Sequence, residues 1–272
     1  MKKLYISADI EGVCGIADWK ETEIAEAQGA YFREQMTREV CAVCEAACEA
    51  GVEEIFVKDA HGSGRSINPM MLPRNVRLMR ASTRGPFSMM AGIDESFGGA
   101  AFVGYHSGAG TNGNPLAHTM DTNNVYVLVN GELASEFLIN AYTAASFGVP
   151  VLFLSGDRLL CERAAKLDPG IRTVAVSEGL GNASISIHPT LAVERIKKTA
   201  TAVFGAAAAL TAARGSRSLA LPGEFKIEIR FRQHHLAYRG SFYPGASQAG
   251  PYEVAYATGS WLDALKFLFF VL

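Results

Sequence analysis

The chain has 272 residues, of which 49% are hydrophobic and 19% are charged, and its formal net charge is −2. This length suffices for one large domain or for a domain with a smaller companion, and the composition is globular rather than disordered. A charge so close to zero excludes the extended basic surface that nucleic acid requires, and no lysine-rich amphipathic segment suits a membrane surface. We therefore expect a small neutral or zwitterionic ligand, and neither nucleic acid nor a membrane as partner.

The two ends of the chain and its cysteines bear on where the protein works. Two lysines near the N-terminus are typical of a signal peptide, but Asp9 and Glu11 follow before an apolar segment can develop. The apolar run 267–272 is far shorter than the ~20 residues of a membrane-spanning helix. Five cysteines, an odd number, indicate reduced thiols rather than a disulfide framework. We expect a cytoplasmic protein.

Short apolar runs bounded by turn residues predict five strands in the first part of the chain. These runs are 4–8, 54–58, 100–105, 125–130 and 151–155. A long helix is predicted over 21–50, and a shorter one, capped by Asp157, over 158–166. A strand, a crossover helix and a second strand are typical of parallel sheets. The sequence therefore predicts an α/β fold with a mostly parallel, Rossmann-like sheet and helices on both faces.

Three cysteines lie within the predicted long helix at a spacing that metal sites also use. Cys41, Cys44 and Cys48 follow one another at steps of three and four residues, which places them along one helix face among alanine and valine. We interpret them as buried helix residues rather than as metal ligands.

A hairpin is predicted after the fourth strand. Asn130-Gly131 favours a type I′ turn, and a helical pattern follows over 135–146. Glu136 is therefore expected in the first turn of a helix.

The character of the sequence changes beyond about residue 170. An alanine-rich helix is predicted over 191–213, and alternation of apolar with charged residues predicts a half-exposed strand over 225–232. We expect an α/β domain over 1–205 and a smaller C-terminal α+β unit over 206–272, with no linker to mark the boundary.

Metal-ligating side chains follow three of the predicted strands at the point where each ends. Asp9 and Glu11 follow the first strand and project to the same side, while His61 and His106 follow the second and third. Open parallel sheets bind ligands at this edge. Two carboxylates there repel each other unless a cation neutralises them, and carboxylate with histidine is a usual zinc ligand set. The sequence therefore predicts a metal site.

Two further residues could complete the site. Glu136 would supply the acidic ligand that a second zinc needs, but the helix dipole also favours an acid in a first turn, so both interpretations stay open. His118, in the glycine- and asparagine-rich segment 111–120, could act on a substrate at the metals or could only pack its loop. The three histidines beyond residue 180 lie outside the strand-end pattern and are not expected to take part.

In these residues the chain resembles the zinc-dependent D-aminopeptidases associated with bacterial dipeptide transport. Five motifs of that family occur here in the same order. They are S-x-D-x-E-G at 7–12, D-x-H at 59–61, G-Y-H at 104–106, the loop histidine before Thr-Met at 118–120, and E-x-x-x-N-A-Y at 136–142. Order and spacing agree over residues 1 to about 160.

The resemblance implies two zinc ions per chain and a bridging role for Asp9. The other implied ligands form one pair for each ion: Glu11 with His61, and His106 with Glu136. The resemblance also implies a ring-shaped homo-oligomer, a decamer, and removal of N-terminal D-residues from short peptides, although a relative could prefer L-dipeptides.

The resemblance assigns His118 as the catalytic residue, which the family describes as a nucleophile. The mechanism that we expect is attack on the peptide carbonyl by water activated between two zinc ions. His118 would then transfer a proton or stabilise the oxyanion, because a two-zinc centre already supplies a nucleophile.

Two alternative functions remain at this stage. One is a dimetal hydrolase of another small amide or ester, for instance a manganese phosphoesterase, which the scarcity of arginine near the motifs argues against. The other is a non-catalytic binding protein that the metal stabilises.

Overall fold

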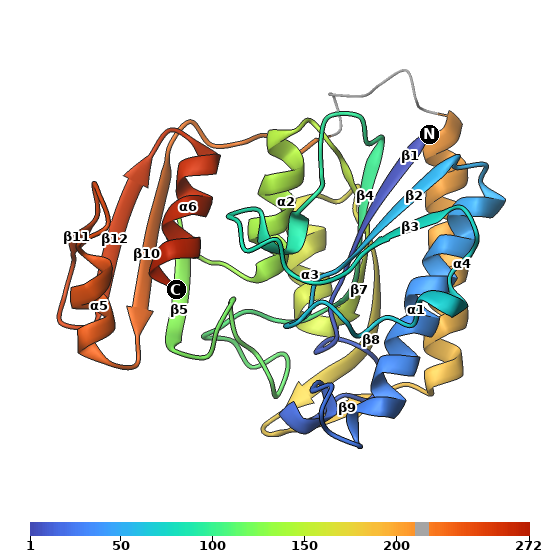
Figure 1. The fold of residues 1–272 in the computed structure, drawn as a ribbon, viewed down its shortest axis with the longest axis horizontal. Coiled ribbons are helices and arrows are strands. Elements are labelled where there is room, and N and C mark those ends of the chain that lie inside the picture. Colours follow the sequence, from blue (N-terminus) through green and yellow to red (C-terminus); the bar gives the residue numbers. More distant parts are fainter. Residues whose placement is uncertain (210–217) are drawn as a thin grey trace.

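The computed structural model describes residues 1–209 and 218–272 and contains two β-sheets (Figure 1). The larger sheet has seven strands in the order β3-β2-β1-β4-β7-β8-β9. All neighbours are parallel except β9, which runs antiparallel to β8. The strands are β1 (Lys3–Ala8), β2 (Glu54–Asp59), β3 (Val76–Met79), β4 (Gly99–Tyr105), β7 (Val151–Asp157), β8 (Arg172–Leu180) and β9 (Ala183–Ser186). The predicted mostly parallel α/β sheet is confirmed.

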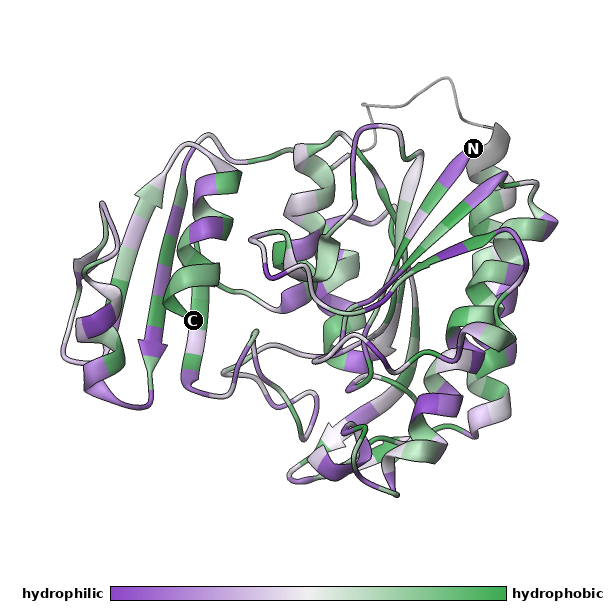
Figure 2. Cartoon of the chain, viewed as in Figure 1, coloured by the Kyte–Doolittle hydropathy of each residue, from purple (hydrophilic) through white to green (hydrophobic). Residues whose placement is uncertain are grey.

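Helices cover both faces of the larger sheet (Figure 1). Helices α1 (Gly29–Glu49) and α4 (Pro189–Ala209) pack on one face, and α2 (Glu136–Ser146) and α3 (Arg158–Leu167) pack on the other. Figure 2 shows hydrophobic segments along the central strands and the helices that face them. Because both faces are covered, a central strand such as β4 is buried at every residue.

The long helix begins later than the sequence predicts. Helix α1 begins at Gly29 rather than near residue 21, because Asp18 caps a separate 3-10 helix, η1 (Trp19–Glu21), in a reciprocal pair of side-chain to backbone hydrogen bonds. Two further 3-10 helices are η2 (Pro69–Met71) and η3 (Ser88–Met90).

The cysteines of α1 contribute to packing. Cys44 lies in the core between α1 and the larger sheet, Cys41 is buried, and Cys48 is half-buried. All five thiols of the chain are free. The interpretation of these cysteines as helix residues rather than metal ligands agrees with this arrangement.

The smaller sheet is antiparallel, with the strand order β11-β12-β10-β5-β6. Its elements are β5 (Asn124–Val129), β6 (Glu132–Leu133), β10 (Phe225–Phe231), α5 (His234–Gly240), β11 (Ser247–Gln248), β12 (Glu253–Thr258) and α6 (Trp261–Val271). The strand predicted at 125–130 forms as β5, and it belongs to this antiparallel sheet rather than to the larger one. Val127 and Val129 are buried, whereas Tyr126 and Leu128 on the other face are only half-buried, an alternation typical of an antiparallel strand with one covered face.

The hairpin and the half-exposed strand form as predicted. Asn130 and Gly131 have φ angles of 53° and 85°, as a type I′ turn requires. The division of the chain after residue 205 stays a prediction, and the smaller sheet takes β5 and β6 from within residues 1–205. Residues 210–213 of the predicted alanine-rich helix lie outside the described residues. Among the described helices, none is long and apolar enough to span a membrane.

Helix α2 lies between the two sheets (Figure 1). Phe137 and Ala141 belong to the core of the larger sheet, whereas Ile139 belongs to the core of the smaller one. The helix that begins with Glu136 is therefore fixed from two sides.

Candidate metal centre

The candidate ligands lie where three neighbouring strands of the larger sheet end. Strand β1 pairs in parallel with β2 on one side and with β4 on the other, so the residues after these strands meet at one edge. Asp9 and Glu11 follow β1, His61 follows β2, and His106 follows β4. The structure thus brings together the four residues that the strand-end pattern singled out.

Two glycines let the ends of β1 and β4 approach each other closely. Gly12 N donates to Gly104 O at 2.8 Å, and a Cβ on Gly12 would lie 1.8 Å from the carbonyl oxygen of Tyr105. Gly104 has a φ of 69°, and a Cβ there would lie 2.4 Å from the carbonyl oxygen of Asp9. Any larger residue at Gly12 or Gly104 would push the two strand ends apart. The two glycines therefore allow Asp9 and His106 to lie close together.

Asp9 lies at the centre, with one carboxylate oxygen toward each histidine. Its Oδ1 is 3.3 Å from His61 Nδ1, and its Oδ2 is 3.5 Å from His106 Nε2. Glu11 Oε2 lies 3.0 Å from the same His61 nitrogen, and Glu136 Oε2 lies 3.4 Å from His106 Nε2. Two groups of potential metal ligands therefore share Asp9, and in each group the ligand atoms lie within 4.8 Å of one another.

Glu136 reaches the centre from a different layer of the fold. It is the first residue of α2, whose start is capped by Ser135, and a helix N-terminus favours a carboxylate. Its Oε1 accepts a hydrogen bond from Met120 N at 2.7 Å, which leaves Oε2 toward His106. The sequence left two interpretations of Glu136 open: an acid that the helix dipole favours, and a metal ligand. The structure is compatible with both at once.

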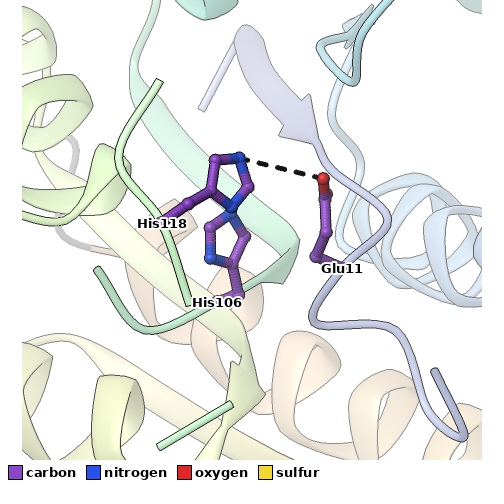
Figure 3. Close-up of side chains that lie close together, drawn as sticks. All are labelled: Glu11, His106 and His118. Atoms are coloured by element: carbon purple, nitrogen blue, oxygen red, sulfur yellow. Dashed lines mark ion pairs between the residues drawn. The ribbon is translucent and has the colours of Figure 1, made fainter. Parts of the chain in front are cut away.

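His118 lies beside the ligands with its ring in a fixed orientation. Its Nδ1 is 2.9 Å from the carbonyl oxygen of Leu116, which can only accept, so Nδ1 carries the proton. Its Nε2 is 3.5 Å from Glu136 Oε1 and 4.0 Å from Glu11 Oε1. The ring stacks on His106, with centroids 4.4 Å apart, and Figure 3 shows these two histidines with Glu11, which together form a third group of potential ligands.

The polar atoms of the centre fit a cation. Asp9, Glu11 and Glu136 are each at most 4% exposed. Asp9 Oδ2 and His106 Nε2 are buried and make no hydrogen bond to any residue that the structure describes. Such atoms lower stability unless something binds them, and carboxylate oxygen with imidazole nitrogen is a zinc donor set.

The charges of the centre shift one another's pKa. Burial by itself lowers the pKa of His61, but the carboxylates of Glu11 and Asp9 outweigh it and raise this pKa to about 11. Burial also lowers the pKa of His106, but nearby carboxylates, chiefly that of Glu136, outweigh it and raise this pKa to about 10. Burial, together with the charge of Glu11, raises the pKa of Asp9. A metal that binds here must displace protons from the histidines, so its affinity should fall in acid.

Asp157 orients His106 through the intervening backbone. Its carboxylate accepts hydrogen bonds from Ser107 N at 2.5 Å and Ser107 Oγ at 2.6 Å, and it also caps α3 by accepting from Leu160 N. The carbonyl oxygen of Ser107 lies 2.9 Å from His106 Nδ1, which must therefore donate, leaving Nε2 for the centre. The sequence identified Asp157 only as a helix cap, because its contact with Ser107 joins separate strands.

A cavity of about 350 Å³ opens over the ligands, and sequence reasoning missed part of its lining. The residues missed include Trp19, Ser88, Met89, Asp121 and Thr122. Trp19 packs edge-on against His118, with ring centroids 5.1 Å apart. The only sequence signal for Asp121 is that it directly follows the motif at 118–120. The histidines beyond residue 180 do not line this cavity.

Known proteins resemble the whole chain and not only its motifs. The family model described as Peptidase M55, D-aminopeptidase, matches residues 1–270. A curated D-aminopeptidase of Bacillus subtilis (strain 168) is 28% identical over 267 residues, which are 97% of this chain and 94% of the relative. A solved structure, described as the Zn-dependent D-aminopeptidase DppA from Bacillus subtilis, a self-compartmentalizing protease, has a TM-score of 0.88 and 25% identity and covers 99% of this chain and 96% of its own.

Proposed function

Because the family model matches residues 1–270, the chain belongs to the D-aminopeptidase family and is a peptide hydrolase, and from this premise we propose a di-zinc aminopeptidase. It removes the N-terminal residue, a D-amino acid, from short peptides. The observation that carries the proposal is the pair of ligand groups that share Asp9 at a cavity with His118 in its lining.

Each proposed ligand has a defined place in this scheme. Asp9 would be shared by the two ions, and each remaining pair of ligands would hold one ion: Glu11 with His61, and His106 with Glu136. Bound zinc would supply Lewis-acid activation of water and of the peptide carbonyl. In support, the buried Asp9 Oδ2 and His106 Nε2 make no hydrogen bond within the described chain.

His118 is proposed to move the proton. With Nδ1 held by the Leu116 carbonyl, Nε2 is the basic atom that faces the carboxylates, so it can take a proton from water and return it to the leaving amine. The ring is held between the face of His106 and the edge of Trp19, which keeps this atom in position. Among the described residues, no lysine or arginine lines the cavity, which argues against a phosphoester substrate.

Zinc content and a panel of peptides test the proposal. Protein purified without chelator should contain close to two zinc ions per chain, and His61→Ala and His106→Ala should each lose at least one. The zinc-loaded protein should release amino acids from D-dipeptides faster than from the matching L-dipeptides. Absence of transition metal after zinc is added would overturn the metal centre, and equal rates on both series would overturn the preference for D-residues.

We also propose that the chain assembles in the cytoplasm into a homo-oligomeric ring, a decamer. The DppA structure, whose fold this chain shares, is described as self-compartmentalizing. Tyr238, Phe242 and Phe270 are 58%, 70% and 67% exposed, which provides apolar surface for copies of the chain to bury. Five free thiols fit a reducing compartment. A stable monomer at micromolar concentration in light scattering would overturn the ring and leave the catalysis in place.

A further inference from the structure

One carboxylate of the catalytic cavity belongs to none of the ligand groups. Asp121 lines the cavity together with Glu11 and His118, but it is absent from the groups of potential metal ligands. It forms no ion pair with a lysine, arginine or histidine of the described residues. The cavity therefore contains a carboxylate that none of the potential metal sites uses.

Neighbouring amides hold Asp121 in place. Its Oδ1 accepts from Asn123 N at 2.9 Å and from Asn124 Nδ2 at 2.8 Å, and its Oδ2 accepts from Asn123 Nδ2 at 2.9 Å. The chain turns tightly just before it, because Asp121 N donates to Thr119 O at 2.8 Å and Met120 has a φ of 66°. Neutral amides orient the carboxylate without cancelling its charge, so it can still bind a cation.

A second depression, with charge of the opposite sign, adjoins the cavity at Gly62, which lines both. Its volume is about 410 Å³, and it is lined by Arg65 and Arg84 together with Ser63 and Ser82. Both arginines are exposed, and neither has an acidic partner in the described part of the chain. Two unpaired guanidinium groups beside two hydroxyls suit a carboxylate ligand.

The segments that carry the arginines are tied to each other and to the end of β2. Ala81 N donates to Gly64 O at 2.7 Å. Lys58, which is 3% exposed, donates from Nζ to Ala81 O at 3.0 Å and also to Asp59 O. Ala81 and Arg84 have φ angles of 65° and 53°, a conformation that persists outside glycine only where the surroundings enforce it. The depression is therefore a fixed part of the fold.

We propose that these charges recognise the two ends of a zwitterionic short peptide. Asp121 binds the N-terminal ammonium group, and Arg65 with Arg84 binds the C-terminal carboxylate. The inference rests on the proposed aminopeptidase function. Cleavage after the first residue places the ammonium on the same residue as the scissile carbonyl, separated from it only by the Cα atom, and so within the cavity that Asp121 lines. The leaving part of the peptide then extends past Gly62 to the arginines. Short peptides with two free termini are thereby preferred to peptides with a blocked or distant end.

Substrates that differ only at the C-terminus test the arginines. Di- and tripeptides that begin with D-alanine and end in glycine are compared as free acid and as C-terminal amide. At one of these lengths, kcat/KM should be about fivefold higher for the free acid, the scale of an exposed ion pair. Arg65→Gln combined with Arg84→Gln should raise KM for the free acid to that of the amide. The control Arg77→Gln, whose arginine is exposed and paired with Glu54, should keep the preference.

The ammonium contact is tested with a second pair of variants. Asp121→Asn should raise KM for every free-amine peptide about fivefold, with a smaller change in kcat, and should keep the zinc content and melting temperature of the parent protein. The control Glu95→Gln removes an exposed carboxylate that lines neither depression and should match the parent protein in KM.

A binding measurement separates failure of this inference from failure of the proposed function. Calorimetric titration of zinc-loaded His118→Ala protein with the same peptides should give a Kd about fivefold lower for the free acid than for the amide. No cleavage of any peptide by the parent protein would overturn the proposed function, and the titration would still decide the inference. Equal Kd and equal kcat/KM for acid and amide at both lengths would overturn the role of the arginines. An unchanged KM in Asp121→Asn would overturn the role of Asp121.

Discussion

The two sheets of the molecule place their charged residues in opposite ways. In the smaller sheet, β10 points its apolar side chains into the core and its charged ones outward, where Arg230 pairs with Glu253 at 2.9 Å. At the carboxyl edge of the larger sheet, Asp9, Glu11 and Glu136 are buried within reach of one another. Like charges persist in a protein interior only when opposite charge balances them. The first arrangement is that of a solvated surface, and the second is the one that we propose for the binding of cations.

The sharpest test of this contrast is the removal of one carboxylate from each sheet. Asp9→Ala should abolish binding of both zinc ions and with it peptidase activity, because Asp9 belongs to both ligand groups. Glu136→Ala should leave one zinc largely in place. Glu228→Ala, which removes a carboxylate of β10 bonded to Tyr126, should keep both ions and full activity. Elemental analysis of the three variants decides, and equal zinc loss from Asp9→Ala and Glu136→Ala would contradict the bridging role.

The same contrast has a consequence for stability. Asp9→Asn removes one of three crowded negative charges at nearly constant shape. After exhaustive chelation, this variant should therefore unfold at a temperature no lower than that of the parent protein. A clearly lower melting temperature would mean that the carboxylate stabilises the fold without any metal.

Binding and chemistry should separate at His118. His118→Ala should keep both zinc ions and the fold but lose roughly 10²- to 10⁴-fold in kcat, the scale of general acid–base catalysis. Zinc content, melting temperature and turnover are measured on one preparation. Nearly normal kcat with full zinc would show that the histidine only packs against His106 and Trp19.

Much of the catalytic edge could be predicted from the sequence because its determinants are local. Asp9 and Glu11 project to one side of a strand end by simple alternation, and parallel neighbours carry His61 and His106 to the same edge. The resemblance to the D-aminopeptidases, drawn from the motifs, is confirmed by the match over residues 1–270. The structure gives the distances between these side chains, which place Asp9 in two groups of potential metal ligands. The roles of the ligands stay proposals.

Features that depend on distant partners could not be predicted. The strand at 125–130 could be predicted, but its partner could not: it pairs with β10, where Val129 lies opposite Ile227. Helix α1 is shorter than predicted, because Asp18 caps a separate short helix that begins at Trp19. This short helix places Trp19 at the cavity. The partner of the strand is far along the chain, whereas Asp18 and Glu21 form a local capping box, a signal that the sequence analysis did not use.

A buried carboxylate away from the metal centre provides a smaller test. Glu39 Oε1 on α1 accepts from Cys14 N and Gln35 Nε2, each at 3.1 Å, while Oε2 is buried and lacks a hydrogen bond from the described residues. Burial raises the pKa of Glu39 from 4.5 to about 7. The folded state holds this proton more tightly than the unfolded state. The stability that this group contributes is therefore present below pH 4.5 and is lost as the pH rises through about 7.

Glu39→Gln should remove this dependence on pH. The variant should match the parent protein near pH 5 and exceed it near pH 8 by up to about 3 kcal/mol in free energy of unfolding, measured with urea. Glu34→Gln, on the exposed side of the same helix, should show no such difference between the two pH values. A Glu39→Gln variant less stable than the parent protein at pH 8 would mean that the ionised carboxylate is stabilised in the fold.

The smallest effect is expected on the solvent face of the smaller sheet. Arg230 and Glu253 lie opposite each other on β10 and β12, with side chains 46% and 17% exposed. Pairs of this kind contribute at most ~1 kcal/mol, because water screens the charges and ordering two side chains costs entropy. Arg230→Ala should therefore lower the free energy of unfolding by less than that and leave zinc content and kcat intact. A lower activity with normal zinc content and normal stability would contradict this expectation. It would mean that the solvent face of the smaller sheet affects the active site through assembly of the oligomer. Light scattering on the same sample shows whether the oligomer has changed.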